Sequence, residues 1–174
     1  MRRYSSILAG VALFGACAAL APADQVDMTP TDIQVRGGIF IPFDTNLRDV
    51  SDNFGGLGVD VLFPQEYLPN SKTYLSVDWL AKSFSGSHGN IIPVCINQKF
   101  YGKPVDGHNV YLFVGLGATF FDVYGSDTRL GARAGVGYDL SQNVFLEGTF
   151  YWSDKSNNGD VSNIGAGFYI GYRW

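Results

Sequence analysis

Residues 128–140 read TRLGARAGVGYDL, in which apolar residues alternate with glycine and charge. The even positions from Leu130 to Leu140 are all apolar, whereas the odd positions hold only arginine, glycine and aspartate. Because successive side chains of a β-strand point to opposite faces, this spacing predicts a strand with one apolar and one polar face. Residues 144–152 and 164–174 repeat the alternation, so the pattern extends to the C-terminus.

The same period of two recurs through the rest of the chain, and segments rich in Gly, Pro, Asn, Asp and Ser separate the repeats. No helical period competes with it after residue 23. The sequence therefore predicts an all-β chain, an eight-stranded antiparallel up-and-down barrel. We place its strands at 33–41, 56–63, 73–82, 91–101, 109–123, 128–140, 144–152 and 164–174.

Alternation alone does not say which face lies inside the barrel. A soluble lipocalin-like barrel turns its apolar face inward, whereas a transmembrane barrel turns it toward lipid. The last four predicted strands are 9–15 residues long, and about 9–11 tilted residues cross a bilayer. Arg133 lies in mid-strand, where facing lipid would cost about 2–4 kcal/mol. We therefore predict a transmembrane barrel whose polar face lines the lumen.

The polar face carries six basic and four acidic side chains, and this near-balance suits a narrow lumen in which charges must pair. The predicted lumen charges are Arg36, Asp60, Asp78, Lys82, Lys99, Arg129, Arg133, Asp139, Glu147 and Arg173. Glycines on the same face would leave room for these long side chains: Gly115, Gly117, Gly131, Gly135, Gly165 and Gly167. Aromatic side chains near strand ends predict an interfacial girdle: Trp79, Trp152, Tyr172 and Trp174.

Residues 1–23 have the features of a secretory signal peptide: two arginines, a short apolar stretch and Ala-Pro-Ala at 21–23. Lipidation of Cys17 is an alternative with a poor recognition sequence before it. We expect 24–32 to be a short periplasmic lead and 33–174 to form the barrel. The mature chain would keep one cysteine, Cys95, which excludes an internal disulfide.

The whole chain has 174 residues and a net charge of −4, which suits one domain and argues against nucleic-acid binding. Removing 1–23 takes away two arginines and leaves 10 basic and 16 acidic side chains, a net charge of −6.

The signal peptide, the glycine-rich hairpins over 111–147 and the last strand, FYIGYRW, together resemble the small outer-membrane β-barrel family, the class of the OmpA-type transmembrane domain. This resemblance implies a porin-like barrel in a Gram-negative outer membrane, with both termini in the periplasm. It also implies that the barrel-assembly machinery recognises the last strand through Phe168, Ile170, Tyr172 and Trp174. The family more often ends in Phe than in Trp, and we expect no peptidoglycan-anchoring domain after Trp174.

Extracellular loops should be longer than periplasmic turns. The segments 42–55 and 153–163 agree with this rule, whereas 124–127 is shorter than the supposed turn at 64–72. The strand register over 33–101 therefore stays open.

Two chemical readings compete with a purely structural role. Catalysis would need a His–Ser pair with an acid, but His88 lies in a Gly/Ser-rich loop and His108 in a turn at the other end. The oxygens of Asp154, Ser156, Asn158 and Asp160 mimic half of a calcium loop, but glycine stands where the closing glutamate belongs. We expect a polar turn there, and neither enzymatic activity, metal nor cofactor.

The sequence as a whole predicts a monomeric outer-membrane barrel that contacts lipid, has a plugged or narrow lumen, and serves a structural, envelope-stabilising or surface-interaction role. The main alternative is a small channel for ions or small solutes. A soluble exported ligand-binding barrel and a membrane-embedded lipid-modifying enzyme are further alternatives.

Overall fold

The computed structural model describes residues 33–64, 67–82, 89–105 and 107–174. The predicted signal peptide with Cys17, the lead at 24–32 and His88 lie outside the described residues. Within the described ranges, no helix is long and apolar enough to cross a membrane.

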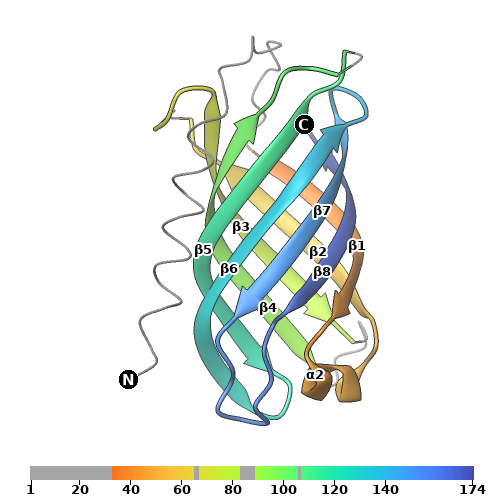
Figure 1. Ribbon diagram of the computed structural model, residues 1–174, viewed down its shortest axis with the longest axis vertical. Coiled ribbons are helices and arrows are strands. Elements are labelled where there is room, and N and C mark those ends of the chain that lie inside the picture. The colour runs from red at the N-terminus through yellow and green to blue at the C-terminus, as the bar shows by residue number, and fades with distance from the viewer. Residues whose placement is uncertain (1–32, 65–66, 83–88, 106) are drawn as a thin grey trace.

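Eight antiparallel strands form a closed barrel, in which each strand pairs with its sequence neighbours and β1 closes onto β8 (Figure 1). The strands are β1 (Ile33–Pro42), β2 (Phe54–Leu62), β3 (Ser71–Ala81), β4 (Asn90–Tyr101), β5 (Val110–Asp122), β6 (Ser126–Asp139), β7 (Val144–Ser153) and β8 (Gly165–Arg173). Every predicted boundary lies within two residues of the observed one. The predicted eight-stranded up-and-down barrel is confirmed.

A short helix, α2 (Thr45–Val50), lies between β1 and β2. Asp44 caps it by accepting a hydrogen bond from the backbone N–H of Leu47 at 3.0 Å, a role for which Asp is well suited. The prediction that no helix follows residue 23 is wrong at this point. Six residues hold fewer than two helical turns, which is too short for an apolar period to be recognised.

Strand β6 shows which face of the sheet lies inside. Arg133 is 2% exposed, whereas Leu130 and Val136 on the alternate face are 55% and 47% exposed. Residues that pair directly across strands share a face, so Gly115 on β5 and Tyr151 on β7, which flank Arg133, also point inward. The polar face therefore lines the lumen, and the apolar face forms the outer wall.

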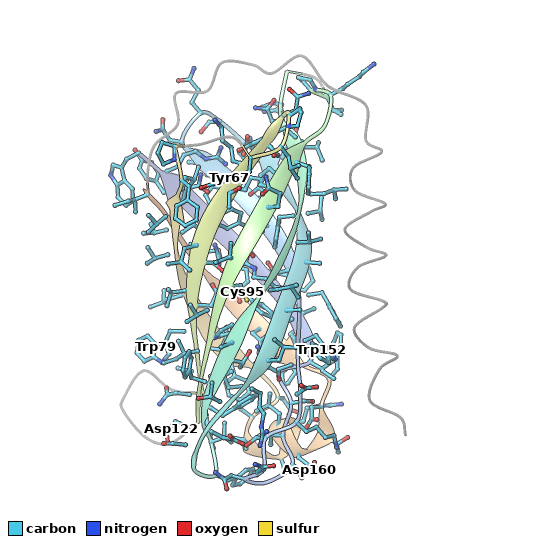
Figure 2. All side chains as sticks on the ribbon, turned by 90° about the vertical axis from the view of Figure 1, so that its left-hand side faces the viewer. Tyr67, Trp79, Cys95, Asp122, Trp152 and Asp160 are labelled. Atoms are coloured by element: carbon cyan, nitrogen blue, oxygen red, sulfur yellow. The ribbon has the colours of Figure 1, made fainter. Side chains whose placement is uncertain are left out.

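Exposed apolar side chains occur on all eight strands, and Figure 2 shows side chains projecting along the length of the wall. We call this set the apolar belt: Ile33, Ile39, Leu57, Val59, Val61, Val77, Ile96, Leu112, Leu116, Phe120, Leu130, Val136, Leu146, Phe150, Phe168, Ile170 and Tyr172. In water, so large an apolar surface would be exceptional for a monomer.

The two ends of the barrel differ (Figure 1). At the loop end lie α2 and the connections β1–β2, β3–β4, β5–β6 and β7–β8. At the turn end lie the connections β2–β3, β4–β5 and β6–β7 and the C-terminus. The two connections predicted to be long, β1–β2 and β7–β8, thus emerge on the same side.

Candidate functional site

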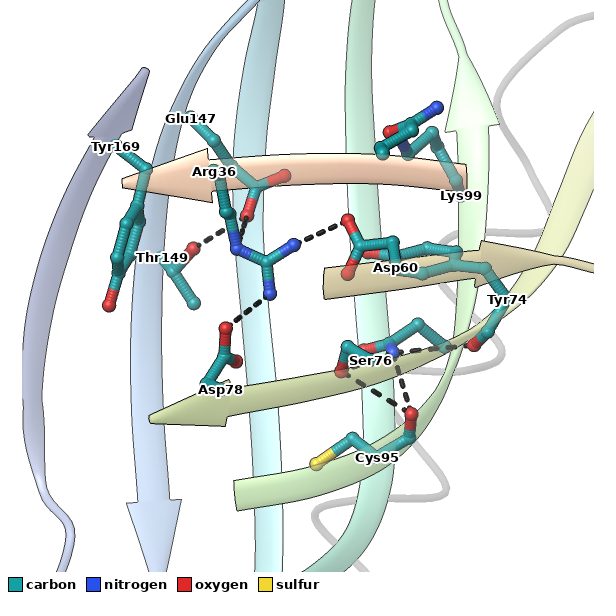
Figure 3. Close-up of polar contacts among 12 residues, drawn as sticks. Arg36, Asp60, Tyr74, Ser76, Asp78, Cys95, Lys99, Glu147, Thr149 and Tyr169 are labelled. Atoms are coloured by element: carbon teal, nitrogen blue, oxygen red, sulfur yellow. Dashed lines mark hydrogen bonds and ion pairs between the residues drawn. The ribbon is translucent and has the colours of Figure 1, made fainter. Parts of the chain in front are cut away.

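Arg36 lies at the centre of a charge network that crosses the lumen (Figure 3). Its guanidinium donates through Nη1 to Asp60 Oδ2 and through Nη2 to Asp78 Oδ1, the latter at 2.5 Å. Its Nε also lies 3.6 Å from Glu147 Oε1. The four side chains are at most 1% exposed, so a residue of β1 contacts β2, β3 and β7 without intervening solvent.

Arg133 on β6 joins the same carboxylates from the opposite wall. Its Nη1 donates to Asp78 Oδ2 at 3.0 Å and its Nη2 to Glu147 Oε1 at 2.8 Å. The hydroxyls of Tyr151 and Thr149 donate to Asp78 and Glu147 at 3.1 and 3.0 Å. These donors satisfy carboxylates that would be costly to bury alone.

Lys99 on β4 is held differently, by aromatic rings. Its Nζ lies 4.3 Å from the ring centre of Tyr111, 5.0 Å from that of Tyr74 and 5.8 Å from that of Phe145. Gln34 Oε1 accepts a hydrogen bond from it at 3.3 Å. Among the described residues, no carboxylate lies within ion-pair distance of Lys99, so cation–π attraction replaces a salt bridge.

A second ion pair, between Arg173 of β8 and Asp139 of β6, lies toward the turn end of the lumen. The buried charged residues of the described chain are four basic and four acidic: Arg36, Lys99, Arg133 and Arg173 against Asp60, Asp78, Asp139 and Glu147. The buried charge therefore sums to zero, which is the condition for keeping so many charges in a narrow interior.

All eight belong to the ten lumen charges predicted from the sequence. The other two, Arg129 and Lys82, lie near the loop end and are less buried, and Arg129 shares the inner face with its pairing partner Thr119. Arg129 is half-buried near the loop end and pairs with Asp127 at 2.8 Å. Lys82 follows the end of β3 and is exposed. Its assignment to the lumen is wrong, because alternation ceases to determine side-chain direction once the strand ends.

The loop-end half of the lumen is filled by an apolar core. Its members come from seven strands, α2 and two connections, and all are at most 8% exposed: Phe40, Leu47, Phe54, Leu80, Ile91, Phe121, Val123, Tyr151, Val161 and Tyr169. The sequence does not predict this core, since aromatic residues on the inner face resemble those of the outer wall in hydropathy. The alternation does carry a signal, because Tyr151 and Tyr169 have the same odd numbering as the charged residues of their strands and therefore lie on the charged face.

Two connections fold over this core and close the loop end. Leu47 from α2 and Val161 from the β7–β8 connection are fully buried in it. The Asp44 carboxylate accepts from Ser162 Oγ at 2.6 Å, and Asn46 Nδ2 donates to the carbonyl of Asp160 at 3.2 Å. These contacts join α2 to the β7–β8 connection, so the mouth carries a packed cap.

Asp127 also stabilises this cap through hydrogen bonds. It lies near the tip of the β5–β6 hairpin, beyond the apolar belt. Its carboxylate accepts from the Asn157 backbone N–H at 2.7 Å, from Ser156 Oγ at 3.0 Å and from Arg129 Nη2 at 2.8 Å. These hydrogen bonds, that from Asn157 foremost, lower the pKa of Asp127 to about 2. The sequence does not reveal this contact, because the partners lie about thirty positions apart.

The calcium candidate is not assembled in this cap. Ser156 Oγ is engaged with Asp127, and the Asp160 carboxylate accepts from Lys155 Nζ at 2.8 Å. Among the described residues, no group of three or more His, Cys, Asp or Glu side chains could hold a metal ion. The contacts agree with a polar turn.

The predicted girdle residues lie on the outer wall at both ends. Trp79 and Trp152 are half-buried near the loop end, at similar height on opposite sides (Figure 2). Tyr172 and Trp174 lie at the turn end, 43% and 57% exposed. The outward residues of the final strand, Phe168 to Trp174 at every second position, are all exposed; their role in assembly stays a prediction.

The glycines of the inner face leave room mainly for aromatic rings and amide groups, whereas the sequence predicts that they make room for charged side chains. A Cβ at Gly137 would overlap the ring of Tyr111, and one at Gly115 would overlap the amide of Asn97. Among the described glycines, only Gly58 would press directly on the charge network, against Asp78 first and then Arg36. The inner glycines thus make space mainly for the packed interior.

His108 and Cys95 are the remaining described residues considered for chemistry. His108 lies at the turn end, where its Nδ1 is 2.9 Å from the carbonyl oxygen of Asp139. Cys95 is free and buried in the wall of the lumen. Neither arrangement provides an activated nucleophile.

No known family and no curated protein match this sequence significantly. Among solved structures, the chain is similar to the crystal structure of Neisserial surface protein A (NspA), with 13% identity and a TM-score of 0.49 over 82% of this chain and 96% of that one. So distant a likeness carries no inference about function, and the barrel assignment rests on the strand pairing of the chain itself.

Proposed function

We propose that the chain is an outer-membrane barrel with a closed lumen and a structural, envelope-stabilising or surface-interaction role. The main observation behind this proposal is that the barrel has the opposite arrangement from a water-soluble protein. The apolar belt is exposed on every strand, while four basic and four acidic side chains are buried in the interior. Such a surface suits lipid as its solvent and a packed, polar interior. The resemblance of the last strand to outer-membrane barrels supports the choice of membrane.

The packing of the interior supports a closed rather than a conducting lumen. The apolar core fills the loop-end half, the ion pairs cross the middle, and Lys99 with its aromatic rings occupies the part toward the turn end. An eight-stranded barrel is only just wide enough for its own side chains. The same packing opposes an internal ligand cavity of the lipocalin type, and the proposal assigns the chain no catalytic activity.

Refolding tests both parts of this proposal. In detergent micelles we expect a folded, heat-modifiable species on gels, and in planar bilayers we expect no stepwise conductance. A chain that stays folded and monomeric in detergent-free buffer would overturn the membrane assignment. Reproducible conductance steps would overturn the closed lumen and favour the channel alternative.

A further inference from the structure

The outer wall contains a shallow trough across β7, β8, β1, β2 and β3. It has a volume of about 710 Å³ and an almost wholly apolar lining. One flank is a row of residues that pair directly across the five strands: Val144, Tyr172, Val35, Val59 and Val77.

The other flank is the adjacent row on the same face, and it contains a gap. Gly37 of β1 sits between Ile170 of β8 and Leu57 of β2, and Leu57 pairs onward with Trp79. A Cβ at Gly37 would meet only Leu57, at 3.6 Å. The missing side chain therefore provides depth in the middle of the trough.

Length and charge indicate what the trough accommodates. Five strands span four inter-strand spacings, about 19 Å in total, while one leaflet of a hydrocarbon core is about 15 Å thick. Arg36, the only charged residue along the trough, turns its guanidinium into the lumen toward Asp60 and Asp78. The trough is thus long enough for one acyl chain and presents no charge to a headgroup.

We propose that this trough binds one acyl chain of a membrane phospholipid and retains it while the surrounding lipid exchanges. The inference rests on the proposed function, because the trough is continuous with the apolar belt that would face lipid. Trp79 at one end of the trough provides a reporter. Its indole Nε1 donates to Asn90 at 3.0 Å, which keeps the ring in place on the wall.

The experiment uses a chain with Trp79 as its only tryptophan, made by Trp152→Phe and Trp174→Phe. It is folded into phosphatidylcholine vesicles whose acyl chains carry bromine, which quenches tryptophan on contact. The vesicles are then dissolved in excess bromine-free detergent, so that loosely held lipid is diluted away. We expect quenching in vesicles and persistent quenching in detergent, with one phospholipid retained per chain by native mass spectrometry.

Gly37→Leu fills the trough and should lower the retained lipid about tenfold, as expected for lost contact with one or two methylenes. Val59→Phe fills it from the next strand and guards against a folding defect in the first variant. Gly148→Leu is the matched control. Gly148 is an outward glycine that does not line the trough, and a Cβ there has open space, with Val136 at 4.0 Å.

Each outcome decides one point. Loss of persistent quenching in both trough-filling variants, with retention in Gly148→Leu, supports the bound chain. Quenching in vesicles that vanishes in detergent for the parent chain overturns the trough proposal and leaves membrane insertion standing. Persistent quenching in all variants also overturns it, since the chain would then be held elsewhere. No quenching in vesicles overturns the proposed membrane location itself.

Discussion

Replacing Arg133 by methionine removes one charge from the centre of the lumen while keeping an unbranched side chain about as long as the aliphatic part of arginine. The guanidinium bonds Asp78 at 3.0 Å and Glu147 at 2.8 Å, and all three side chains are fully buried. The variant would leave three basic against four acidic side chains in the interior.

The loss of stability in this variant can be estimated from buried ion pairs in other proteins. Removing one partner of a buried ion pair destabilises a protein by about 3–5 kcal/mol. Asp78 keeps Arg36 and Tyr151 as partners, and Glu147 keeps Thr149, so we expect the lower end, about 3 kcal/mol. At an m value of about 2 kcal/mol per molar urea, the midpoint would fall by about 1.5 M.

The assay is urea unfolding in lipid vesicles, followed by tryptophan fluorescence and by gel mobility. Arg133→Met combined with Glu147→Gln restores equal charge numbers and should recover about half of the loss, a coupling typical of contacting residues. Lys155→Met, in an exposed pair with Asp160 at 2.8 Å, should leave the midpoint unchanged. The reasoning is refuted if Arg133→Met shifts the midpoint no more than Lys155→Met, or if the double variant is weaker than Arg133→Met alone.

Three further predictions concern packing and the cap. Leu47→Ala should lower the free energy of unfolding by about 2–5 kcal/mol, measured by urea unfolding, because this side chain is fully buried in the apolar core; a change below about 1 kcal/mol would contradict its place there. Gly137→Ala should lower the free energy of unfolding by about 1–3 kcal/mol, because the added methyl group overlaps the ring of Tyr111. Gly148→Ala on the open outer face should not lower the midpoint of urea unfolding. Equal effects of the two substitutions would contradict the tighter packing of the inner face. Because the pKa of Asp127 is lowered to about 2, its contribution to the cap is complete above about pH 4 and is lost as the pH falls through 2. The amide-exchange protection of Asn157 should fall in that window, and Asp127→Asn should abolish the pH dependence; protection that is constant down to pH 2 would contradict the assignment.

Most of the barrel could be predicted because its strands obey one rule along their whole length. Alternation around Arg133 was enough to place the charged face inside, since the energetic penalty of the opposite choice is large. The same rule fails at Lys82, because this residue follows the end of β3, where alternation no longer fixes the side-chain direction. The six residues of α2 lay below the length at which a helical period can be detected.

The inner apolar core and the cap required coordinates for a different reason. Phe40 and Phe121 have the hydropathy of lipid-facing residues, and the strand register places both on the inner face. The contact between Asp127, at the start of β6, and Asn157 in the β7–β8 connection follows no pairing rule that the local sequence could show. Contacts between segments that lie far apart in the chain were therefore the part of the structure that could not be predicted from the sequence.

The span of the ion pairs along the chain has a consequence for assembly. Arg36 meets Asp78 at a separation of 42 positions, and Asp78 meets Arg133 at 55. A partial sheet of early hairpins would therefore carry charge without its counter-charge into the bilayer, at a cost of several kcal/mol for each ion. Insertion and closure should thus be concerted, an all-or-none transition in which β6 and β7 bring Arg133 and Glu147 to the charges of the first three strands.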